Sequence, residues 1–262
     1  MTDTPLLADQ RRARILAEVA RTGGVRVADL VEALGVSEMT VRRDITALDR
    51  DGLLTRVHGG AVDREGSASE PAFAEKLARS APAKAAIAAR AAALVEPGAA
   101  VAISGGTTTM ALASAVAGLE HAASLTILTN SLPAADVLHA APRRPTVILT
   151  GGERTPSDAL VGPAAVRTCA DFHVDVLFLG VSGMDGRAGL TTPNLAEAET
   201  LAALIGCAQR VVVLADSAKW GVVGLRTLAR WDAVDILVTD PDLPPDAREA
   251  LGETTEILEA TP

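Results

Sequence analysis

The sequence is poor in aromatic residues and in cysteine. Its 262 residues include no tyrosine, two tryptophans and three phenylalanines. Most of the apolar content is alanine, valine and leucine, which favours helices packed on valine-rich strands over an aromatic-rich β-sandwich. The two cysteines, Cys169 and Cys207, cannot form a disulfide framework, and neither belongs to a Cys-x-x-Cys pair. We expect both thiols, together with Trp220 and Trp231, to be packing residues.

Long apolar runs and a targeting segment are also missing. No stretch of 18 apolar residues is unbroken, and Arg90 interrupts the best alanine-rich candidate, so a membrane-spanning helix is not expected. The first residues, MTDTP, lack the basic and apolar regions of a secretory signal. His121, His139 and His173 lie far apart and beside no other metal-ligating cluster, so neither a metal nor a cofactor is expected. These absences predict a soluble, cytoplasmic protein.

Positive charge is scarce in the larger part of the chain. The net charge is −9, but residues 1–64 carry ten arginines and ten acidic residues and are neutral. The whole deficit therefore falls in residues 65–262, which would repel nucleic acid. Any contact with DNA must come from local arginine clusters in the first part. An apolar content of 48% and a charged content of 22% exclude global disorder and allow a sizeable core.

The chain divides into two domains. Residues 63–71 are small and polar, without an apolar period, and are typical of a linker. Residues 1–62 contain three short helical patterns followed by a hairpin pattern. Residues 72–262 begin with an alanine-rich helix, expected over 72–95, and continue as strands alternating with helices, which predicts a parallel sheet in an α/β fold. The expected strands cover residues 100–104, 125–129, 146–150, 175–181, 211–215 and 236–239.

The N-terminal pattern is that of a winged helix-turn-helix. Gly35 can take the left-handed conformation that ends one helix, and Ser37 can cap the next only two residues later. Val41 and Ile45 then face the core, which leaves an outer face with adjacent arginines, as a major-groove reader needs. The alternative is a small helical bundle with a solvated face. The residues expected to contact DNA are Ser37, Glu38, Met39, Thr40, Arg42, Arg43, Arg56, His58, Gly59 and Gly60.

Polar loops follow several of the predicted strands and suggest an anion site. Two glycines and three threonines, residues 105–109, open a helix, where backbone N–H groups and the helix dipole favour a phosphate. Neither a nucleotide-binding P-loop nor a dinucleotide fingerprint is present. For residues 105–109, the alternative is a simple turn that caps a helix. For Lys219, it is an exposed solubilising charge. For Asp185 and Glu197, it is capping of turns or of a helix. The expected effector-binding residues are Ser104, Gly105, Gly106, Thr107, Thr108, Thr109, Asn130, Gly151, Gly152, Asp185, Glu197 and Lys219.

Several motifs resemble the DeoR-type family of bacterial sugar-metabolism repressors. They are RRARIL at 11–16, LGVSEMTVRRD at 34–44, LLTRVHGGA at 53–61, GGTTT at 105–109 and ADSAKWG at 215–221. The resemblance covers about residues 11–240. It implies a C-terminal domain similar to ribose-5-phosphate isomerase that senses a phosphorylated sugar. The family often has aspartate where Ser104 and Ser182 stand here, which leaves the identity of the sugar open.

Three functions are compatible with these patterns. The first is a transcriptional regulator, a repressor of a carbohydrate-metabolism operon, whose affinity for DNA is modulated by a phosphorylated sugar and which acts as a dimer or tetramer. The alternative is a sugar-phosphate isomerase with an accessory helical domain. Isomerisation needs a general base, which Ser182 cannot supply, although Asp185 remains. The third is an interaction module that binds neither DNA nor a ligand. We expect a regulator and not an enzyme.

Overall fold

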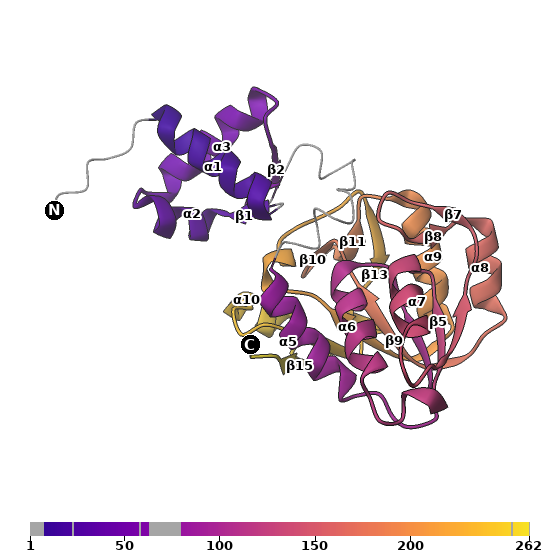
Figure 1. Ribbon diagram of the computed structural model, residues 1–262. Helices are drawn as coiled ribbons and strands as arrows, with labels where there is room; N and C mark the ends of the chain where they lie inside the picture. Colours follow the sequence, from indigo (N-terminus) through magenta and orange to yellow (C-terminus); the bar gives the residue numbers. More distant parts are fainter. Residues whose placement is uncertain (1–7, 23, 58, 63–79, 253, 262) are drawn as a thin grey trace.

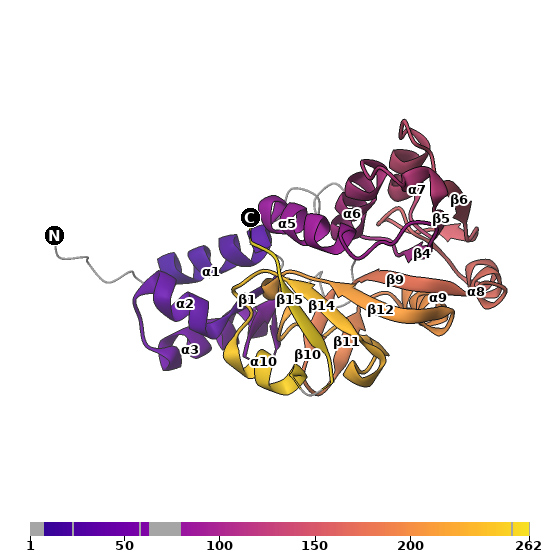
Figure 2. The same cartoon turned by 90° about the horizontal axis from the view of Figure 1, so that it is seen from below.

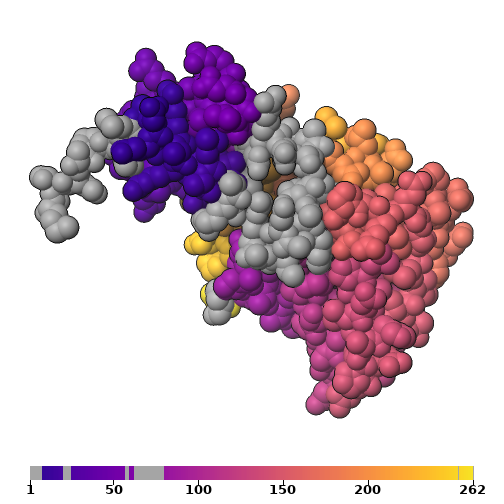
Figure 3. All heavy atoms as spheres, turned by 45° about the horizontal axis from the view of Figure 1, so that its top comes forward, coloured from indigo at the N-terminus to yellow at the C-terminus, as the bar shows by residue number. Residues whose placement is uncertain are grey.

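The protein has an N-terminal helical domain and a larger α/β domain (Figure 1). The computed structural model describes residues 8–22, 24–57, 59–62, 80–252 and 254–261. In the space-filling view, the indigo and violet atoms of the N-terminal domain form a lobe beside the magenta-to-orange α/β domain (Figure 3). Among the described residues, no helix combines the length and the apolar character that crossing a membrane requires.

The N-terminal domain contains three helices and a small antiparallel sheet. Its elements are α1 (Ala8–Thr22), β1 (Gly24–Arg26), α2 (Val27–Leu34), α3 (Glu38–Arg50), β2 (Thr55–Val57) and β3 (Gly60–Val62). Ile15 from α1, Leu30 from α2 and Ile45 from α3 are buried together in its core. The three helices and the hairpin were predicted. Strand β1 was not, because three residues are too few to show an alternating pattern.

The turn between α2 and α3 has the predicted chemistry. Gly35 is left-handed, with φ of +63°, and its N–H donates to the carbonyl of Val31 at 3.0 Å. Ser37 then caps α3, since its Oγ accepts from the N–H of Thr40 at 3.3 Å. The left-handed glycine and the serine cap are therefore confirmed.

The α/β domain is built on a parallel sheet, as predicted. Its strands are β4 (Ala100–Ile103), β5 (Thr126–Thr129), β6 (Thr146–Leu149), β9 (Val174–Gly180), β12 (Ala208–Leu214), β14 (Ile236–Thr239) and β15 (Glu256–Glu259). Their order across the sheet is β15-β14-β12-β9-β4-β5-β6, and every neighbouring pair is parallel. Strand β15 is the only one of these seven that the sequence patterns did not indicate.

Helices cover both faces of this sheet. They are α5 (Ala81–Ala92), α6 (Thr107–Ala117), α7 (Leu132–His139), α8 (Pro163–Ala170), α9 (Leu195–Gly206) and α10 (Pro245–Leu251). Strand β9 shows the alternation: Val176 and Phe178 pack with α5, α6 and α7, whereas Leu177 and Leu179 pack with α8, α9 and α10. Figure 2 shows α5, α6 and α7 on one side of the sheet and α10 on the other.

The alanine-rich helix is shorter than predicted at its carboxyl end. Helix α5 stops at Ala92, three residues before the predicted end at Val95. The predicted beginning, over residues 72–79, lies outside the described residues. Pro97 and Gly98 follow closely and cannot continue a helix, so the turn before β4 has to begin earlier than the apolar pattern alone suggests.

Two small sheets and three 3-10 turns complete the described part of the domain. One sheet pairs β10 (Gly183–Asp185), β11 (Gly189–Thr192) and β13 (Arg226–Ala229), and the other pairs β7 (Glu153–Arg154) with β8 (Leu160–Val161). The turns are η2 (Ala122–Ser124), η3 (Ser217–Lys219) and η4 (Trp231–Ala233). These short elements had no sequence prediction, because two to four residues carry too little pattern to be told from loops.

The order of the strands creates a switch point between β4 and β9. The chain moves outward from β4 through β5 to β6, then returns to β9 on the other side of β4 and moves outward to β15. Connections from β4 and β9 therefore leave in opposite directions. In open α/β sheets, ligands bind in the crevice that such a reversal leaves at the carboxyl ends of the strands. The loop that follows β4 lies at this place.

Candidate DNA-binding surface and effector site

Helix α3 has one buried face and one exposed face, as its pattern predicted. Val41, Ile45 and Leu48 are buried in the core of the domain. Met39 and Arg43 lie one turn apart on the opposite side, and both are exposed. Met39 is 77% exposed, the largest fraction among the exposed large apolar residues of the described chain. An exposed helix face with its N-terminal turn accessible is the geometry that enters a major groove.

The two adjacent arginines of α3 are in different states. Arg42 Nη2 lies 2.7 Å from Glu38 Oε1, one turn earlier on the same helix. Arg43 is exposed and makes no hydrogen bond or ion pair with the described residues. The Arg42–Glu38 pair is itself exposed on both sides, and such pairs contribute little to stability. Arg43 is therefore the guanidinium that needs no rearrangement to reach a base edge.

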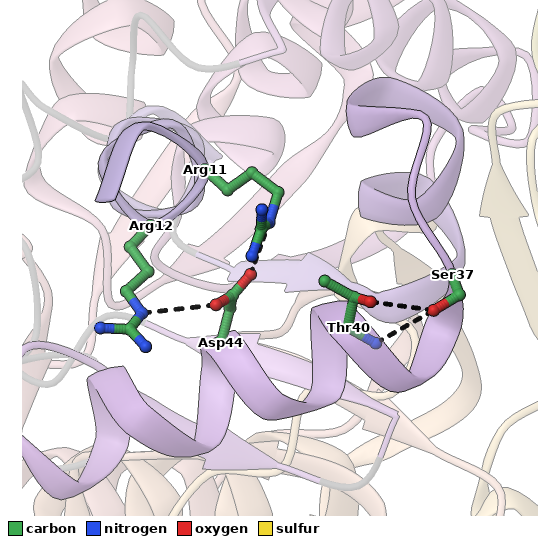
Figure 4. A network of polar contacts seen from close by, with 5 residues as sticks. All are labelled: Arg11, Arg12, Ser37, Thr40 and Asp44. Carbon is green, nitrogen blue, oxygen red and sulfur yellow. Dashed lines mark hydrogen bonds and ion pairs between the residues drawn. The ribbon is translucent and has the colours of Figure 1, made fainter. Parts of the chain in front are cut away.

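Asp44 joins α3 to α1, a role that the sequence analysis did not assign. Its side chain is 4% exposed, and it accepts from two consecutive arginines of α1 (Figure 4). Arg11 Nε lies 2.8 Å from Asp44 Oδ2, and Arg12 Nε lies 3.3 Å from Asp44 Oδ1. The arginine pair near the amino end thus holds the recognition helix in place. Ion pairs within one helix can be recognised in a sequence because the partners are three or four residues apart. Asp44 and its arginines are more than thirty residues apart, so the sequence carried no such signal.

The hairpin wing is fastened to α3. Arg56 donates its backbone N–H to Asp49 Oδ1 at 3.1 Å, and its Nη1 lies 3.3 Å from Thr46 Oγ1. A Cβ on Gly60 would lie 2.1 Å from the carbonyl oxygen of Val25, so this glycine allows β1 to approach β3. Gly59 takes the left-handed turn conformation, with φ of +83°. His58 lies outside the described residues.

At the switch point, the loop after β4 is held by its neighbours. Gly180 at the end of β9 donates its N–H to Ser104 Oγ at 2.9 Å. Gly105 donates its N–H to Asn130 Oδ1 at 2.8 Å, and Asn130 Nδ2 donates to the carbonyl of Leu160 at 3.1 Å. Ser104 and Asn130 are both buried. Their side chains position the loop, and the amide of Asn130 also holds β8 beside it.

The first turn of α6 offers donors at this loop. Gly106 is the N-cap and supplies no side-chain cap for the helix. Thr109 Oγ1 donates to the carbonyl of Gly106 at 3.0 Å, which occupies that hydroxyl. Thr107 is buried and Thr108 is half-buried. Backbone N–H groups at a helix start attract an anion, because they point outward along the helix dipole.

A buried lysine near this loop was missed by the sequence analysis. Lys84 lies in the first turn of α5 and is only 7% exposed. Residues 93–99 connect the end of α5 to the start of β4, so the start of α5 lies at the carboxyl edge of the sheet. Helix α5 packs along α6, which begins at the same edge, and also contacts β12. Lys84 therefore belongs to the same edge as residues 105–109. Its burial was the signal, and burial is not visible in a single sequence.

Lys219 approaches the same edge from β12. It ends the turn η3, which follows β12, and it is half-buried. Strand β9 separates β12 from β4, so the two strands are roughly 10 Å apart. The turn is fixed from two sides, because Ser217 donates its N–H to Asp240 Oδ2 at 2.8 Å and Gly221 donates its N–H to the carbonyl of Met184 at 2.7 Å. Lys84 and Lys219 already take part in polar or electrostatic contacts.

The two predicted carboxylates differ in their surroundings. Asp185 Oδ1 accepts from the N–H groups of Arg187 and Ala188, at 2.8 and 2.7 Å, and so caps the turn between β10 and β11. Glu197 is buried in the first turn of α9, and Thr155 Oγ1 lies 3.4 Å from its Oε1. Asn194, not Glu197, caps α9. Thus Asp185 has the turn-capping arrangement that was one of its two alternatives.

Two glycines close the far side of the loop cluster. Gly151 and Gly152 follow β6 with φ of +70° and +117°. A Cβ on Gly152 would lie 2.3 Å from the carbonyl oxygen of Val161, so the position allows the strand β8 to pass closely. These two glycines lie near the carboxyl edge of the sheet and allow close packing there. They have no side chain that could hold a ligand.

The tryptophans and cysteines pack, as expected. Trp220 and Trp231 are buried with ring centroids 6.0 Å apart, and Trp231 Nε1 donates to the carbonyl of Asp185 at 3.0 Å. Cys169 and Cys207 are free and buried. Burial, and then the nearby Cys207 thiol, raises the pKa of Cys169 to about 11. Among the described residues, no group of three His, Cys, Asp or Glu side chains is arranged to hold a metal ion.

Comparison with known families decides the class of protein. A DeoR-like helix-turn-helix domain matches residues 11–65, and a DeoR C-terminal sensor domain matches residues 79–241. The chain belongs to the DeoR family. Its helix-turn-helix binds DNA, and the resemblance stated from the motifs is thereby confirmed. The predicted fold, a winged helix-turn-helix followed by a parallel-sheet α/β domain, is confirmed by the strand order and by these two matches.

The relatives of this DeoR-family chain are named as transcriptional regulators. The regulator GlpR of Haloferax volcanii is 35% identical over 94% of this chain and 95% of its own length. The transcriptional repressor CsqR of Escherichia coli is 31% identical over 98% of this chain and 97% of its own length. The regulator GolR of Listeria innocua is 31% identical, with coverage of 88% and 90%. This DeoR-family chain is therefore a transcriptional regulator and not an enzyme.

Among solved structures, the DeoR-family chain is similar to ribose-5-phosphate isomerase A of Methanocaldococcus jannaschii. The identity is 16%, the TM-score is 0.39, and the match covers 52% of this chain and 53% of that one.

A contact between the two domains links strand β1 of this regulator's N-terminal domain to the turn that carries Lys219. Arg26, the last residue of β1, donates from Nη2 to the backbone carbonyl of Ser217. The Nε of Arg26 is buried without a hydrogen-bond partner in the described structure. The contact therefore joins the base of the DNA-binding domain to the turn η3, at the carboxyl edge of the sheet.

Proposed function

We propose that this regulator represses a carbohydrate-metabolism operon and that a phosphorylated sugar modulates its affinity for DNA. The observation that carries the effector part is the convergence at the switch point of the sheet. Backbone donors of residues 106–109 lie at the same edge as Lys84 and Lys219. The domain as a whole is acidic, so an anion needs such local positive groups. A phosphate is the group that uses both a helix N-terminus and lysine ammonium groups.

The remaining predicted residues take supporting places in this proposal. Ser104 and Asn130 hold the loop. Glu197, whose Oε1 accepts from Thr155 Oγ1 at 3.4 Å, is the carboxylate that we assign to a sugar hydroxyl, because Asp185 caps a turn. Ser104 stands where related proteins often have aspartate, which argues for a different set of hydroxyl contacts. The phosphate contacts would be shared by any phosphorylated sugar, so the hydroxyl contacts select among them.

The contact between Arg26 and Ser217 supports a route between the two sites. An effector can change DNA affinity only by as much as it prefers one arrangement of the two domains. Ser217 belongs to the same short turn as Lys219, and Arg26 begins the segment that leads directly into α2. A phosphate on Lys219 that shifts this turn would move the carbonyl that Arg26 holds. The helix-turn-helix would then be released from its position.

We also propose that the regulator acts as a homo-oligomer, a dimer or a tetramer, in the cytoplasm. A single N-terminal module carries no net charge and offers few phosphate contacts, so tight binding requires repeated half-sites. The measurement is light scattering of the full chain at micromolar concentration. A monomer that nevertheless binds its duplex tightly would contradict this part.

The effector proposal is tested with a duplex selected by the purified protein from random DNA. The affinity of the protein for this duplex is measured at increasing concentrations of each sugar phosphate in a panel, and of the same sugars without phosphate. We expect a 5–150-fold change with the matching phosphorylated sugar and much less with its unphosphorylated form. Lys219→Ala should bind DNA normally without ligand and respond weakly. Equal responses to both sugars would refute the phosphate.

Arg210→Ala is the matched control. Arg210 lies near the opposite end of the same strand, β12, and is exposed. Like Lys219→Ala, the substitution removes one positive charge from this domain, but it leaves the carboxyl edge of the sheet unchanged. A wild-type response in Arg210→Ala and a weakened response in Lys219→Ala would separate a local contact from the effect of net charge. The two tryptophans, one of them beside Lys219, give an independent fluorescence readout of effector binding.

A further inference from the structure

We propose that Met39 reads the methyl group of a thymine in the major groove and thereby fixes one base pair of each half-site. This inference rests on DNA binding by α3. The side chain of Met39 is the most exposed of the large apolar residues in the described chain. Removing an exposed apolar side chain from water is favourable, so contact with an apolar group of a partner would stabilise a complex at this position. In the major groove, the C5-methyl group of thymine is the apolar feature that a base presents.

The position of Met39 on α3 favours this partner over others. It is the second residue of the helix, and the N-terminal residues of a recognition helix are those that contact base edges. Its neighbours are already engaged, since Ser37 Oγ and Thr40 Oγ1 lie 2.9 Å apart and Glu38 pairs with Arg42. Met39 is the first side chain of the helix that projects without a local polar partner to hold it. Methionine is also flexible enough to follow the surface of a methyl group.

Arg43 sets the spacing of a second base. It lies one turn after Met39 on the same exposed face, and an arginine there pairs with guanine. Four residues of helix rise by about 6 Å, and base pairs are about 3.4 Å apart along the duplex. The two side chains therefore reach base pairs roughly two steps apart. The geometry predicts a half-site in which a thymine lies one or two base pairs from a guanine.

The test uses the full chain and a duplex that the wild-type protein selects from random DNA. Each thymine of the half-site is replaced in turn by deoxyuridine, which removes only the methyl group and keeps the base pairing. We expect one replacement to weaken wild-type binding roughly fourfold, the value for one buried methyl group. Met39→Ala should bind the original duplex as weakly as the wild type binds the uridine duplex. It should be insensitive to that replacement.

Leu53→Ala is the matched control, because Leu53 is also an exposed apolar residue of the same domain but follows α3 instead of lying on its face. It should respond to deoxyuridine as the wild type does. Repeating the selection should show that Met39→Ala loses its preference only at the thymine and Arg43→Ala only at the guanine. Since Met39 is exposed, its replacement should leave the unfolding temperature unchanged.

Three outcomes would overturn the inference. In the first, the wild type responds to no deoxyuridine replacement. In the second, Met39→Ala keeps the full response. In the third, Met39→Ala changes the oligomeric state and leaves base preference intact, which would assign the side chain to a contact between copies. In all three cases the wild type still selects a duplex. Selection of no duplex at all would instead contradict DNA binding itself, so the two failures are distinguishable.

Discussion

Arg42 and Glu38 pair one turn apart at the start of the recognition helix, with Arg42 Nη2 2.7 Å from Glu38 Oε1. The neighbouring Arg43 has no such partner among the described residues. The pair is exposed on both sides, so it is worth only a few tenths of a kcal/mol and can open when a phosphate approaches. The two arginines are thus suited to different tasks, base contact for Arg43 and backbone contact for Arg42.

We therefore expect Arg43→Ala to reduce affinity for the selected duplex by about 1–3 kcal/mol, since it loses a base contact. Arg42→Ala should weaken binding to selected and unrelated duplexes alike and should reduce the dependence of affinity on salt. Fluorescence anisotropy at several salt concentrations measures both. If Arg43→Ala binds the selected duplex like the wild type, α3 does not dock as described.

Asp44 is expected to be the most sensitive position for the stability of the N-terminal domain. It is buried and accepts from both Arg11 and Arg12. Asp44→Ala removes the carboxylate that these two guanidinium groups share, which should cost about 2 kcal/mol. Thermal unfolding of the full chain, followed by circular dichroism, measures the loss. Asp51→Ala is the control, because Asp51 is exposed and its ion pair with the exposed Arg50 is long, at 3.6 Å. An equal loss in both variants would refute the anchoring role of Asp44.

Gly105 is expected to be sensitive for a packing reason. A Cβ at this position would lie 2.8 Å from the Cβ of Ala159, while the N–H of Gly105 is fixed to Asn130. Gly105→Ala should therefore push the loop away from the β7–β8 hairpin and weaken the response to effector while DNA binding without ligand stays normal. The double variant Gly105→Ala, Ala159→Gly removes the opposing methyl group and should restore the response. Without such rescue, the clash is not the cause.

The sequence predicted the elements well where one pattern continues for a turn of helix or a run of strand. The core strands, the capped recognition helix and the turn at Gly35 all followed from apolar period and local chemistry. What it could not predict depends on contacts between distant residues. Lys84 stands out only because packing buries it, and Asp44 only because Arg11 and Arg12 pair with it. Strand β15 and the three-residue strands carry too little pattern to be told from loops.

The same limit affected the predicted sites. The glycine and threonine loop was found because its residues are consecutive. The sequence could not show that the side chains of Asn130 and Ser104 would form hydrogen bonds with neighbouring backbone groups. Nor could it show that Asp185 would be taken up by its own turn. Residue type indicates what a side chain can bind, but the fold decides which of its groups remain available.

The buried thiols give a prediction about pH. Burial raises the pKa of Cys169 to about 11 and also raises that of Cys207. The thiolate is the reactive form, so neither cysteine should react with a thiol reagent in the folded protein near neutral pH. The reactivity of Cys169 in the folded form should rise only as the pH approaches 11. Reaction in native buffer is compared with reaction in concentrated urea, where both should react. Labelling of the native protein at pH 7 would show that these thiols are accessible.

The last prediction concerns the contact between Arg26 and the carbonyl of Ser217. If this contact couples the domains, Arg26→Ala should alter the effector response without removing either binding site. We expect effector binding, followed by tryptophan fluorescence, to stay within about twofold of the wild type, while the change in DNA affinity falls from the 5–150-fold range toward none. Arg56→Ala is the contrasting variant, because Arg56 belongs to the wing and contacts Thr46 within its own domain. It should weaken DNA binding but keep the effector response. An unchanged response in Arg26→Ala would show that the effector acts through another contact between the domains.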